Sequence, residues 1–343
     1  MVGIPHGLPQ LRRPRRRRRG AVAVAMTAGV PPGGEFAAID RLMRRLPGPP
    51  AGEVWIGDDA AVVGPAGAQT LLTTDMSIAG VHADLRLMGL DDLGWRAVAA
   101  AVSDIAAMGG RATHVLVAVA GPPSTDLDAL YEGVAQSVEA HGCRVVGGDL
   151  SNAPQVVVVV AVTGVVGEGP GPVLRGGARA GDHLFVTGPL GGSAAGLRIL
   201  RGLAAPGRPP AAASAENPLV RAHRRPRARL AEGTAARRSG ATAMIDVSDG
   251  LAADLGRLAA ASGVGFSLGD VPVAGGATIE EALGGGEDYE LVFAAPDDDA
   301  VRRGFDAAGL AVPIVLGECT ADRDQRQWAG TVLAPSGWEH RFR

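Results

Sequence analysis

The sequence predicts two α/β domains, and three observations support this prediction. The chain has 343 residues, which is the usual size of about two domains. Hydrophobic residues make up 46% of it, enough to fill two cores. Along both halves, short β-branched apolar runs alternate with longer segments of helical periodicity, and this alternation is typical of sheets covered by helices.

The first half of the chain is predicted to form one α/β domain, residues 31–166. The segment 91–108 begins at an aspartate and ends at a glycine pair, as a helix does, and 126–141 is a second helix, closed by Gly142. Extended segments are predicted at 54–56, 60–63, 70–74, 114–120, 144–146 and 156–166.

The second half follows a stretch rich in glycine and proline, 167–181, which we take as the linker. Residues 182–343 form the predicted C-terminal domain. Its expected strands are 183–187, 241–245, 289–295 and 312–316, and its expected helices are 193–201, 218–238, 251–261 and 297–308. The Pro- and Ala-rich segment 204–215 is predicted to be a mobile surface loop.

The charge of the chain is divided unevenly. All 33 basic residues are arginines, so a phosphate loop that depends on lysine is excluded. The formal net charge is −3, but the first 30 residues hold seven arginines and no acidic residue, which leaves −10 on residues 31–343. Such an acidic body argues against nucleic acid as a partner, because phosphate neutralisation needs a basic footprint.

The arginine-rich start, residues 1–30, is predicted to be a disordered tail. A nucleic-acid arm, an export signal and a true start at Met26 are the alternatives. The longest apolar run, 156–162, is too short to cross a membrane, so no membrane partner is expected. Cys143 and Cys319 stand alone, without metal spacing or a disulfide framework, and we therefore expect a cytoplasmic protein.

Acidic residues beside glycines or hydroxyl residues follow or interrupt the predicted strands and helices. They occur at Gly57-Asp58-Asp59, Thr73-Thr74-Asp75, Ser103-Asp104, Gly147-Gly148-Asp149, Asp246-Val247-Ser248-Asp249-Gly250 and Gly286-Glu287-Asp288. Each of these motifs alone has a structural explanation as a turn, a cap or an ion pair. Together they indicate a site of hard oxygen ligands suited to Mg²⁺.

Two of these aspartates stand out for their surroundings. Asp104 shares one face of its predicted helix with Leu93, Ala97, Ala100 and Met108, so its carboxylate needs an arginine, a hydrogen-bond donor or a metal. Asp246 leaves a strand just before a predicted helix, a place where helix capping explains its neighbours Ser248 and Asp249 but not Asp246 itself.

These motifs, in this order and spacing, resemble the thiamine-monophosphate kinases of the aminoimidazole-ribonucleotide-synthetase-like superfamily. The resemblance covers residues 33–343 and includes Gly285-Gly286-Glu287-Asp288-Tyr289-Glu290 and the terminal Gly337-Trp338-Glu339-His340. It implies a two-domain α/β protein that dimerises through its N-terminal domain. It also implies ATP and thiamine monophosphate as substrates and Mg²⁺ as the metal.

The resemblance also implies roles for individual residues. The implied metal ligands are Asp59, Thr73, Thr74, Asp75, Asp104, Asp149, Asp246 and Asp249. Catalysis is expected to depend on Asp75, Asp104, Asp149 and Asp249. The implied ATP contacts are Tyr131, Gly148, Asp149, Arg175 and Ser248. The implied contacts to thiamine phosphate are His82, Glu287 and Trp338.

The implied reaction agrees with the composition. A phosphate nucleophile is already ionised near neutral pH, so charge screening by metal ions is needed more than a general base. Another ATP-dependent enzyme of the superfamily, a catalytically silent nucleotide-binding regulator and a Mg²⁺-dependent phosphatase are the alternatives.

Overall fold

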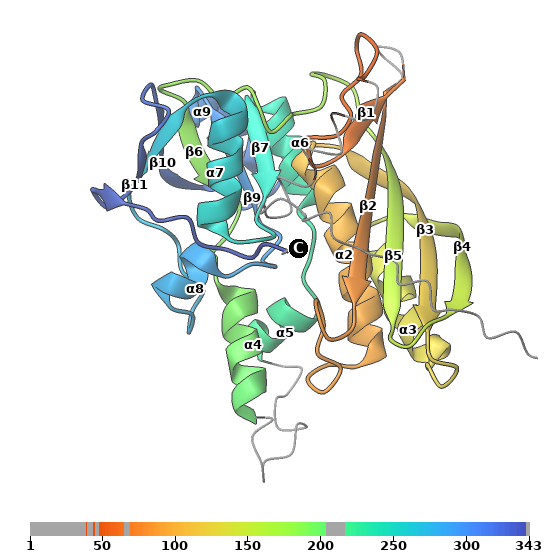
Figure 1. The fold of residues 1–343 in the computed structure, drawn as a ribbon. Helices are drawn as coiled ribbons and strands as arrows, with labels where there is room; N and C mark the ends of the chain where they lie inside the picture. Colours follow the sequence, from red (N-terminus) through yellow and green to blue (C-terminus); the bar gives the residue numbers. More distant parts are fainter. Residues whose placement is uncertain (1–38, 40–43, 45–47, 65–68, 204–216, 341–343) are drawn as a thin grey trace, which may run out of the picture.

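The computed structural model describes residues 39, 44, 48–64, 69–203 and 217–340, and it contains two sheets with helices packed against them (Figure 1). The predicted α/β fold class is confirmed. The predicted tail, residues 1–30, and the predicted surface loop, 204–215, lie outside the described residues.

The N-terminal sheet has the strand order β1-β2-β5-β3-β4. Its strands are β1 (Ala61–Val63), β2 (Thr70–Ile78), β3 (Arg111–Gly121), β4 (Arg144–Asn152) and β5 (Val157–Val165). Neighbouring strands are antiparallel except β3 and β4, which are parallel. Alternate residues of β5, such as Val158 and Val160, are fully buried, so one face of this sheet carries the core.

Two helices cover that face, α2 (Leu90–Ala107) and α3 (Leu127–Ala140). Glycines let them approach closely, because a Cβ on Gly94 would lie 2.1 Å from the Leu130 carbonyl oxygen, and one on Gly133 would lie 1.7 Å from that of Asp91. On the opposite face several described apolar side chains are exposed, among them Leu72, Met76 and Leu116. Every residue of β4 is exposed, including Val146 and Leu150.

The C-terminal sheet has the order β12-β11-β8-β10-β6-β9-β7. Its strands are β6 (His183–Val186), β7 (Ala243–Asp246), β8 (Gly265–Leu268), β9 (Leu291–Ala295), β10 (Ile314–Thr320), β11 (Arg326–Trp328) and β12 (Thr331–Val332). The helices of this half are α4 (Gly192–Leu203), α5 (Pro218–Arg224), α6 (Leu230–Arg238), α7 (Leu251–Ser262), α8 (Ile279–Gly284) and α9 (Asp298–Ala307).

Helix α2 lies between the two sheets and contacts both (Figure 1). Its outer face packs on β2 and β5, while its last turn reaches β7 and α6. Ala106 and Ala107 of α2 belong to the same buried cluster as Phe185 and Phe293 of the C-terminal sheet. The helix that carries Asp104 is therefore anchored in both domains.

Three predicted elements have different limits in the structure. Strand β2 continues to Ile78, so Asp75 lies within the strand and not at its end. Strand β4 continues to Asn152, so the Gly147-Gly148-Asp149 segment is part of the strand. The predicted helix 218–238 is two helices, because the ring of Pro226 cannot continue α5 and the residue before it leaves the helical region.

No helix among the described residues is long and apolar enough to cross a membrane. The short elements β8, α8, β11 and β12 were not predicted, since two to six residues are too few to establish a periodic pattern.

Candidate functional site

Three carboxylates from distant parts of the chain meet between the domains. Oxygen atoms of Asp59, Asp104 and Asp246 all lie within 4.8 Å of one another, and we call these residues the carboxylate cluster. Asp59 precedes β1, Asp104 lies on α2, and Asp246 is the last residue of β7, where it is only 3% exposed. The anchoring of α2 in both domains brings the three together.

Two hydroxyl groups and one guanidinium donate hydrogen bonds to the cluster. Thr73 Oγ1 donates to Asp104 Oδ2 over 2.5 Å, and Ser103 Oγ donates to Asp246 Oδ2 over 2.6 Å. The Arg175 guanidinium donates to Asp59 Oδ1 at 2.6 Å. The second oxygen, Asp59 Oδ2, is buried and has no hydrogen-bond partner. A buried carboxylate oxygen without a donor is suited to a cation.

The pKa shifts of the three carboxylates also indicate a cation site. Burial raises the pKa of Asp104 well above its ordinary value, and the charges of Asp75 and Asp246 raise it further. Burial, followed by the charge of Asp59, does the same to the pKa of Asp246. Burial also raises the pKa of Asp59, against the opposing effect of Arg175. Carboxylates that raise one another's pKa are short of positive charge.

The donor set identifies the kind of cation that fits. Carboxylate and hydroxyl oxygens surround the cluster, and no histidine or cysteine belongs to it. Such oxygen ligands prefer Mg²⁺ or another hard divalent ion to zinc. The residues present therefore fit the Mg²⁺ predicted from the sequence.

The adjacent residues Asp58 and Asp59 have different partners. Both oxygens of Asp58 accept from the backbone N–H of Arg175, at 3.0 and 3.1 Å. Burial and the neighbouring Asp59 raise the pKa of Asp58 to about 6. Asp58 thus connects the segment after β5 to the turn before β1 by hydrogen bonds, while the side chain of Asp59 belongs to the carboxylate cluster.

The three residues Thr73, Thr74 and Asp75 alternate along β2. Thr73 and Asp75 are half-buried on the side of the strand that faces α2, whereas the side chain of Thr74 is exposed on the other side. Asp75 acts electrostatically on both Asp104 and Asp246. Thr73 and Asp75 therefore belong to the site by position, and the hydroxyl of Thr74 does not.

Two loops interlock beside the cluster. Glu287 N–H donates to the Ser248 carbonyl at 2.7 Å, and Tyr289 N–H donates to that of Val247 at 3.0 Å. A Cβ on Gly286 would lie 2.3 Å from the Ser248 carbonyl oxygen, so this close approach requires glycine. Glu287 and Tyr289 adopt positive φ angles of 66° and 52°. Non-glycine residues seldom do so, and they concentrate at functional sites.

The loop Ser248-Asp249-Gly250 is stabilised by hydrogen bonds to the side chain of Asp254. Its Oδ2 accepts from all three backbone N–H groups at 3.0 to 3.1 Å. Burial raises the pKa of Asp254 to about 7. Neither Ser248 nor Asp249 caps α7 with its side chain, so the capping explanation is wrong. Asp249 instead accepts a hydrogen bond from Arg257 at 2.6 Å.

Three residues that were predicted to contact ATP or metal lie away from the carboxylate cluster. They are Tyr131, Gly148 and Asp149, and we call them the edge group. Tyr131 OH donates to the Val117 carbonyl at 3.5 Å, and Gly148 and Asp149 pair with Val117 and Ala118 in the sheet. Strand β4 is the outermost strand, three positions from β2 (Figure 1). At ~4.8 Å per strand, Gly148 and Asp149 lie about 14 Å from β2 along the sheet.

The three residues predicted to contact thiamine phosphate, His82, Glu287 and Trp338, are connected by contacts with Arg96 and His340. Glu287 forms an ion pair with the buried guanidinium of Arg96. His82 Nε2 lies 3.1 Å from His340 Nε2, and the ring of His340 meets that of Trp338 edge-on at 5.9 Å. Glu287 and Arg96 both influence the charge of His82. Trp338 itself is 56% exposed, so it does not pack in the core.

Sequence reasoning missed four residues at this site. Arg96, Asp254, Arg257 and His340 contact predicted site residues, yet none was singled out. Asp254 had a signal, since an acidic residue in the first turn of α7 is placed to accept the loop amides. The partners of Arg96 and His340 lie 191 and 258 residues away, and local patterns hold no such information.

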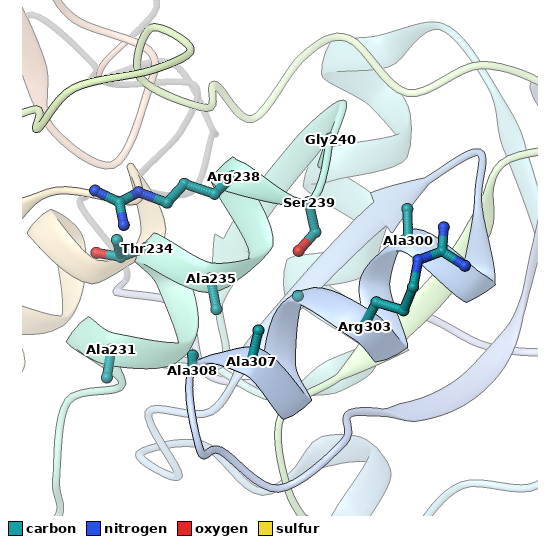
Figure 2. A pocket seen from close by; sticks show the side chains of 11 residues that line it. Ala231, Thr234, Ala235, Arg238, Ser239, Gly240, Ala300, Arg303, Ala307 and Ala308 are labelled. Atoms are coloured by element: carbon teal, nitrogen blue, oxygen red, sulfur yellow. The ribbon is translucent and has the colours of Figure 1, made fainter.

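A pocket of about 590 Å³ between α6 and α9 contains none of the predicted site residues (Figure 2). Small residues, namely alanine, glycine and serine, line most of it, and Arg238 and Arg303 extend from it in opposite directions. Two arginines arranged in this way do not converge on one anion. We therefore place the candidate site at the carboxylate cluster.

Comparison with known proteins points to one family. Residues 57–166 match AIR synthase related protein, N-terminal domain, and residues 179–328 match AIR synthase related protein, C-terminal domain. The thiamine-monophosphate kinase of Mycobacterium tuberculosis is 37% identical over 325 residues, which cover 89% of this chain and 91% of that protein. The thiamine-monophosphate kinase of Aquifex aeolicus is 36% identical over 330 residues, covering 90% and 98%.

The solved structures give a similar result. The structure of AaThiL complexed with AMPPCP and TMP matches this fold with a TM-score of 0.76 and 32% sequence identity. The match covers 90% of this chain and 97% of that one.

Proposed function

This chain belongs to the thiamine-monophosphate kinases of the AIR synthase related family, and on that premise we propose how its residues transfer the γ-phosphoryl group of ATP to thiamine monophosphate. The carboxylate cluster is the observation that carries the proposal. It gathers three acidic groups between the domains beside the guanidinium of Arg175, and one of these carboxylates has an orphaned buried oxygen. AMPPCP and TMP, the two molecules bound to the related AaThiL, are together strongly anionic.

We assign the metal to six side chains. Asp59, Asp104 and Asp246 would hold Mg²⁺ directly, with Thr73 and Asp75 beside them. Asp249, whose carboxylate accepts from Arg257, is included on the strength of the family resemblance. The bound metal would screen the charge between the two anionic substrates and align their phosphates. The hydroxyl of Thr74 is left out of this set, because it lies on the other side of β2.

The reaction itself needs little from the protein beyond position and charge. An oxygen of the thiamine monophosphate phosphate forms a bond to the γ-phosphorus of ATP, and the bond from that phosphorus to the β,γ-bridging oxygen breaks to release ADP. The attacking oxygen is largely ionised at neutral pH, so no general base is assigned. Arg175 lies beside Asp59 and supplies a fixed positive charge at the ATP phosphates.

The thiamine end of the substrate is assigned to His82, Glu287 and Trp338. The carboxylate of Glu287 faces a mixed environment of Arg96 and open space, with its side chain 31% exposed. Trp338 presents a largely free indole face, and a cationic thiazolium ring over such a face gains up to about 2 kcal/mol.

We further propose that the enzyme is a homodimer whose N-terminal sheets pack together. The exposed face of the sheet carries apolar side chains, and Gly148 and Asp149 of the edge group lie on its outermost strand, apart from the carboxylate cluster of their own chain. A second copy that presents its β4 to the cluster would join the two groups of residues. This arrangement accounts for the position of Tyr131, Gly148 and Asp149.

The experiment that tests the function is ADP release from ATP and Mg²⁺ in the presence of different acceptors. We expect ADP with thiamine monophosphate and none above background with thiamine or with aminoimidazole ribonucleotide precursors. Phosphate release without ADP would identify a phosphatase, and nucleotide binding without turnover would identify a regulator.

A further inference from the structure

The last described residues of the chain cross from one domain to the other. This tail segment, residues 333–340, runs from β12 back towards the middle of the molecule (Figure 1). Trp338 N–H donates to the Asp249 carbonyl at 3.1 Å, and a Cβ on Gly337 would lie 2.8 Å from that same oxygen. Two residues later, His340 meets His82 of the N-terminal domain. The segment therefore joins the loop of Asp249 to the turn after β2.

The hydrogen bonds at His82 fix where its proton lies. The backbone N–H of Ile78 points at His82 Nδ1 over 3.0 Å, and an N–H can only donate. Nδ1 is therefore the acceptor, and the proton of the neutral ring is on Nε2. That Nε2–H donates across 3.1 Å to His340 Nε2, which must carry a lone pair. The network thus requires both imidazoles to be neutral.

The charges around the pair agree with this assignment. Burial lowers the pKa of His82, and the neighbouring His340 and Arg96 lower it further, while only Glu287 opposes them. These are the titratable and charged groups that act on His82, from the tail segment, from α2 and from the loop before β9. A proton added to His340 Nε2 would turn that acceptor into a donor facing another donor, and the contact would break.

We infer that His340 is a positioning residue for the phosphoryl-acceptor site. By accepting from His82 Nε2–H, it reinforces the tautomer that the Ile78 N–H also requires, and it orients the His82 ring. The same contact holds the tail segment across the domains, with the indole of Trp338 edge-on to His340 at 5.9 Å. This inference deepens the proposed function and rests on it, because His82 and Trp338 are assigned there to the thiamine end of the substrate.

Substitution of His340 tests the inference by its effect on each substrate. We expect His340→Ala to raise the KM for thiamine monophosphate about tenfold, the cost of roughly one hydrogen bond, and to leave the KM for ATP within twofold. His340→Gln should restore most of the affinity, because its amide oxygen can accept from His82. Glu339→Gln, a change at an exposed neighbour, is the matched control and should match wild type.

The comparison of the two substrates separates positioning from general stabilisation. A His340→Ala enzyme with an unchanged KM for thiamine monophosphate would overturn the inference. So would a His340→Ala enzyme whose KM for ATP rises as much as its KM for thiamine monophosphate, because a general loss of stability would affect both substrates.

A measurement that does not need turnover distinguishes this inference from the proposed function. Nitrogen-15 NMR of the imidazoles at pH 8 should show His82 protonated on Nε2 in wild type and a changed tautomer mixture in His340→Ala. A His82 protonated on Nδ1 in wild type would refute the inference whatever the activity. If wild type makes no ADP with thiamine monophosphate, the proposed function fails, and the NMR result alone decides whether His340 orients His82.

Discussion

At the scale of single residues, the carboxylate cluster carries more negative charge than the neighbouring basic side chains compensate. Asp104 is half-buried and accepts from the Thr73 hydroxyl, Asp246 is buried and accepts from the Ser103 hydroxyl, and Asp59 shares one arginine with Asp58. Burial of like charges costs free energy in the folded state unless a proton or a cation compensates it. The folded protein therefore maintains this acidic site at the expense of its own stability.

Replacing one of these acids by its neutral amide should uncouple stability from activity. For Asp104→Asn we expect turnover to fall at least about 100-fold, because a neutral amide is a poor Mg²⁺ ligand. The metal-free variant should be as stable as wild type or more stable, since a buried charge is removed. Initial rates at saturating Mg²⁺ and thermal melting check both parts. An active variant would remove Asp104 from the site.

The same carboxylates predict how pH affects stability. The folded state raises the pKa of Asp104 and of Asp246 above the usual value near 3.8, so it binds protons that the unfolded chain has released. Their stabilising contribution is complete below about pH 4 and is lost as pH rises through the folded-state pKa. Mg²⁺ should replace these protons, so the gain in Tm on adding Mg²⁺ should be larger at pH 8 than at pH 5.5.

The control for this pH effect is Asp104→Asn. It should show a smaller Mg²⁺-induced gain in Tm, with a weaker dependence on pH. A gain that is equal at both pH values in wild type would mean that Mg²⁺ does not compete with protons at the cluster.

At the scale of elements, the site depends on how a few segments interlock. Helix α2 was predictable because its apolar stripe is long and has clear end signals. The segments 73–75 and 147–149 were mistaken for strand ends, since polar residues inside β2 and β4 look like terminators in a single sequence. The contacts of Arg96 and His340 depend on the packing of the two domains, which no local pattern encodes.

The glycine at the contact of the two site loops provides a test at this scale. Gly286→Ala places a Cβ 2.3 Å from the Ser248 carbonyl oxygen, and the backbone must move. We expect a loss of about 1–3 kcal/mol in the free energy of unfolding, together with reduced turnover. Denaturant melts and initial rates measure these effects. Gly275→Ala is the matched control, because no atom lies within 4 Å of its added Cβ. Equal behaviour of the two variants would show that the loops can separate without cost.

At the scale of the whole molecule, the predicted site residues form two groups that one chain does not bring together. The carboxylate cluster and the thiamine contacts lie between the domains, whereas Gly148 and Asp149 of the edge group lie on the outermost strand of the N-terminal sheet and Tyr131 lies on α3. The exposed apolar residues of that sheet favour a second copy as its partner, because isolated monomers seldom expose such a face.

A charge placed on that face should break the dimer. Leu150 of β4 is 59% exposed, and Leu150→Glu would bury a carboxylate at the proposed interface. Light scattering after gel filtration should give twice the 34.7 kDa chain mass for wild type and the chain mass for the variant, with activity lost in parallel. Val332→Glu, at an 82% exposed position of β12, is the control and should remain dimeric. A monomeric, active wild type would refute the homodimer.

The most direct test of the proposed transfer follows the phosphoryl group itself. The substrate is ATP that carries oxygen-18 at all three non-bridging oxygens of its γ-phosphoryl group. It is incubated with the enzyme, thiamine monophosphate and Mg²⁺, and the masses of the products are measured by mass spectrometry. Direct transfer predicts thiamine diphosphate that contains all three labelled oxygens, together with unlabelled ADP. Label found in inorganic phosphate, with no labelled thiamine diphosphate, would contradict the account.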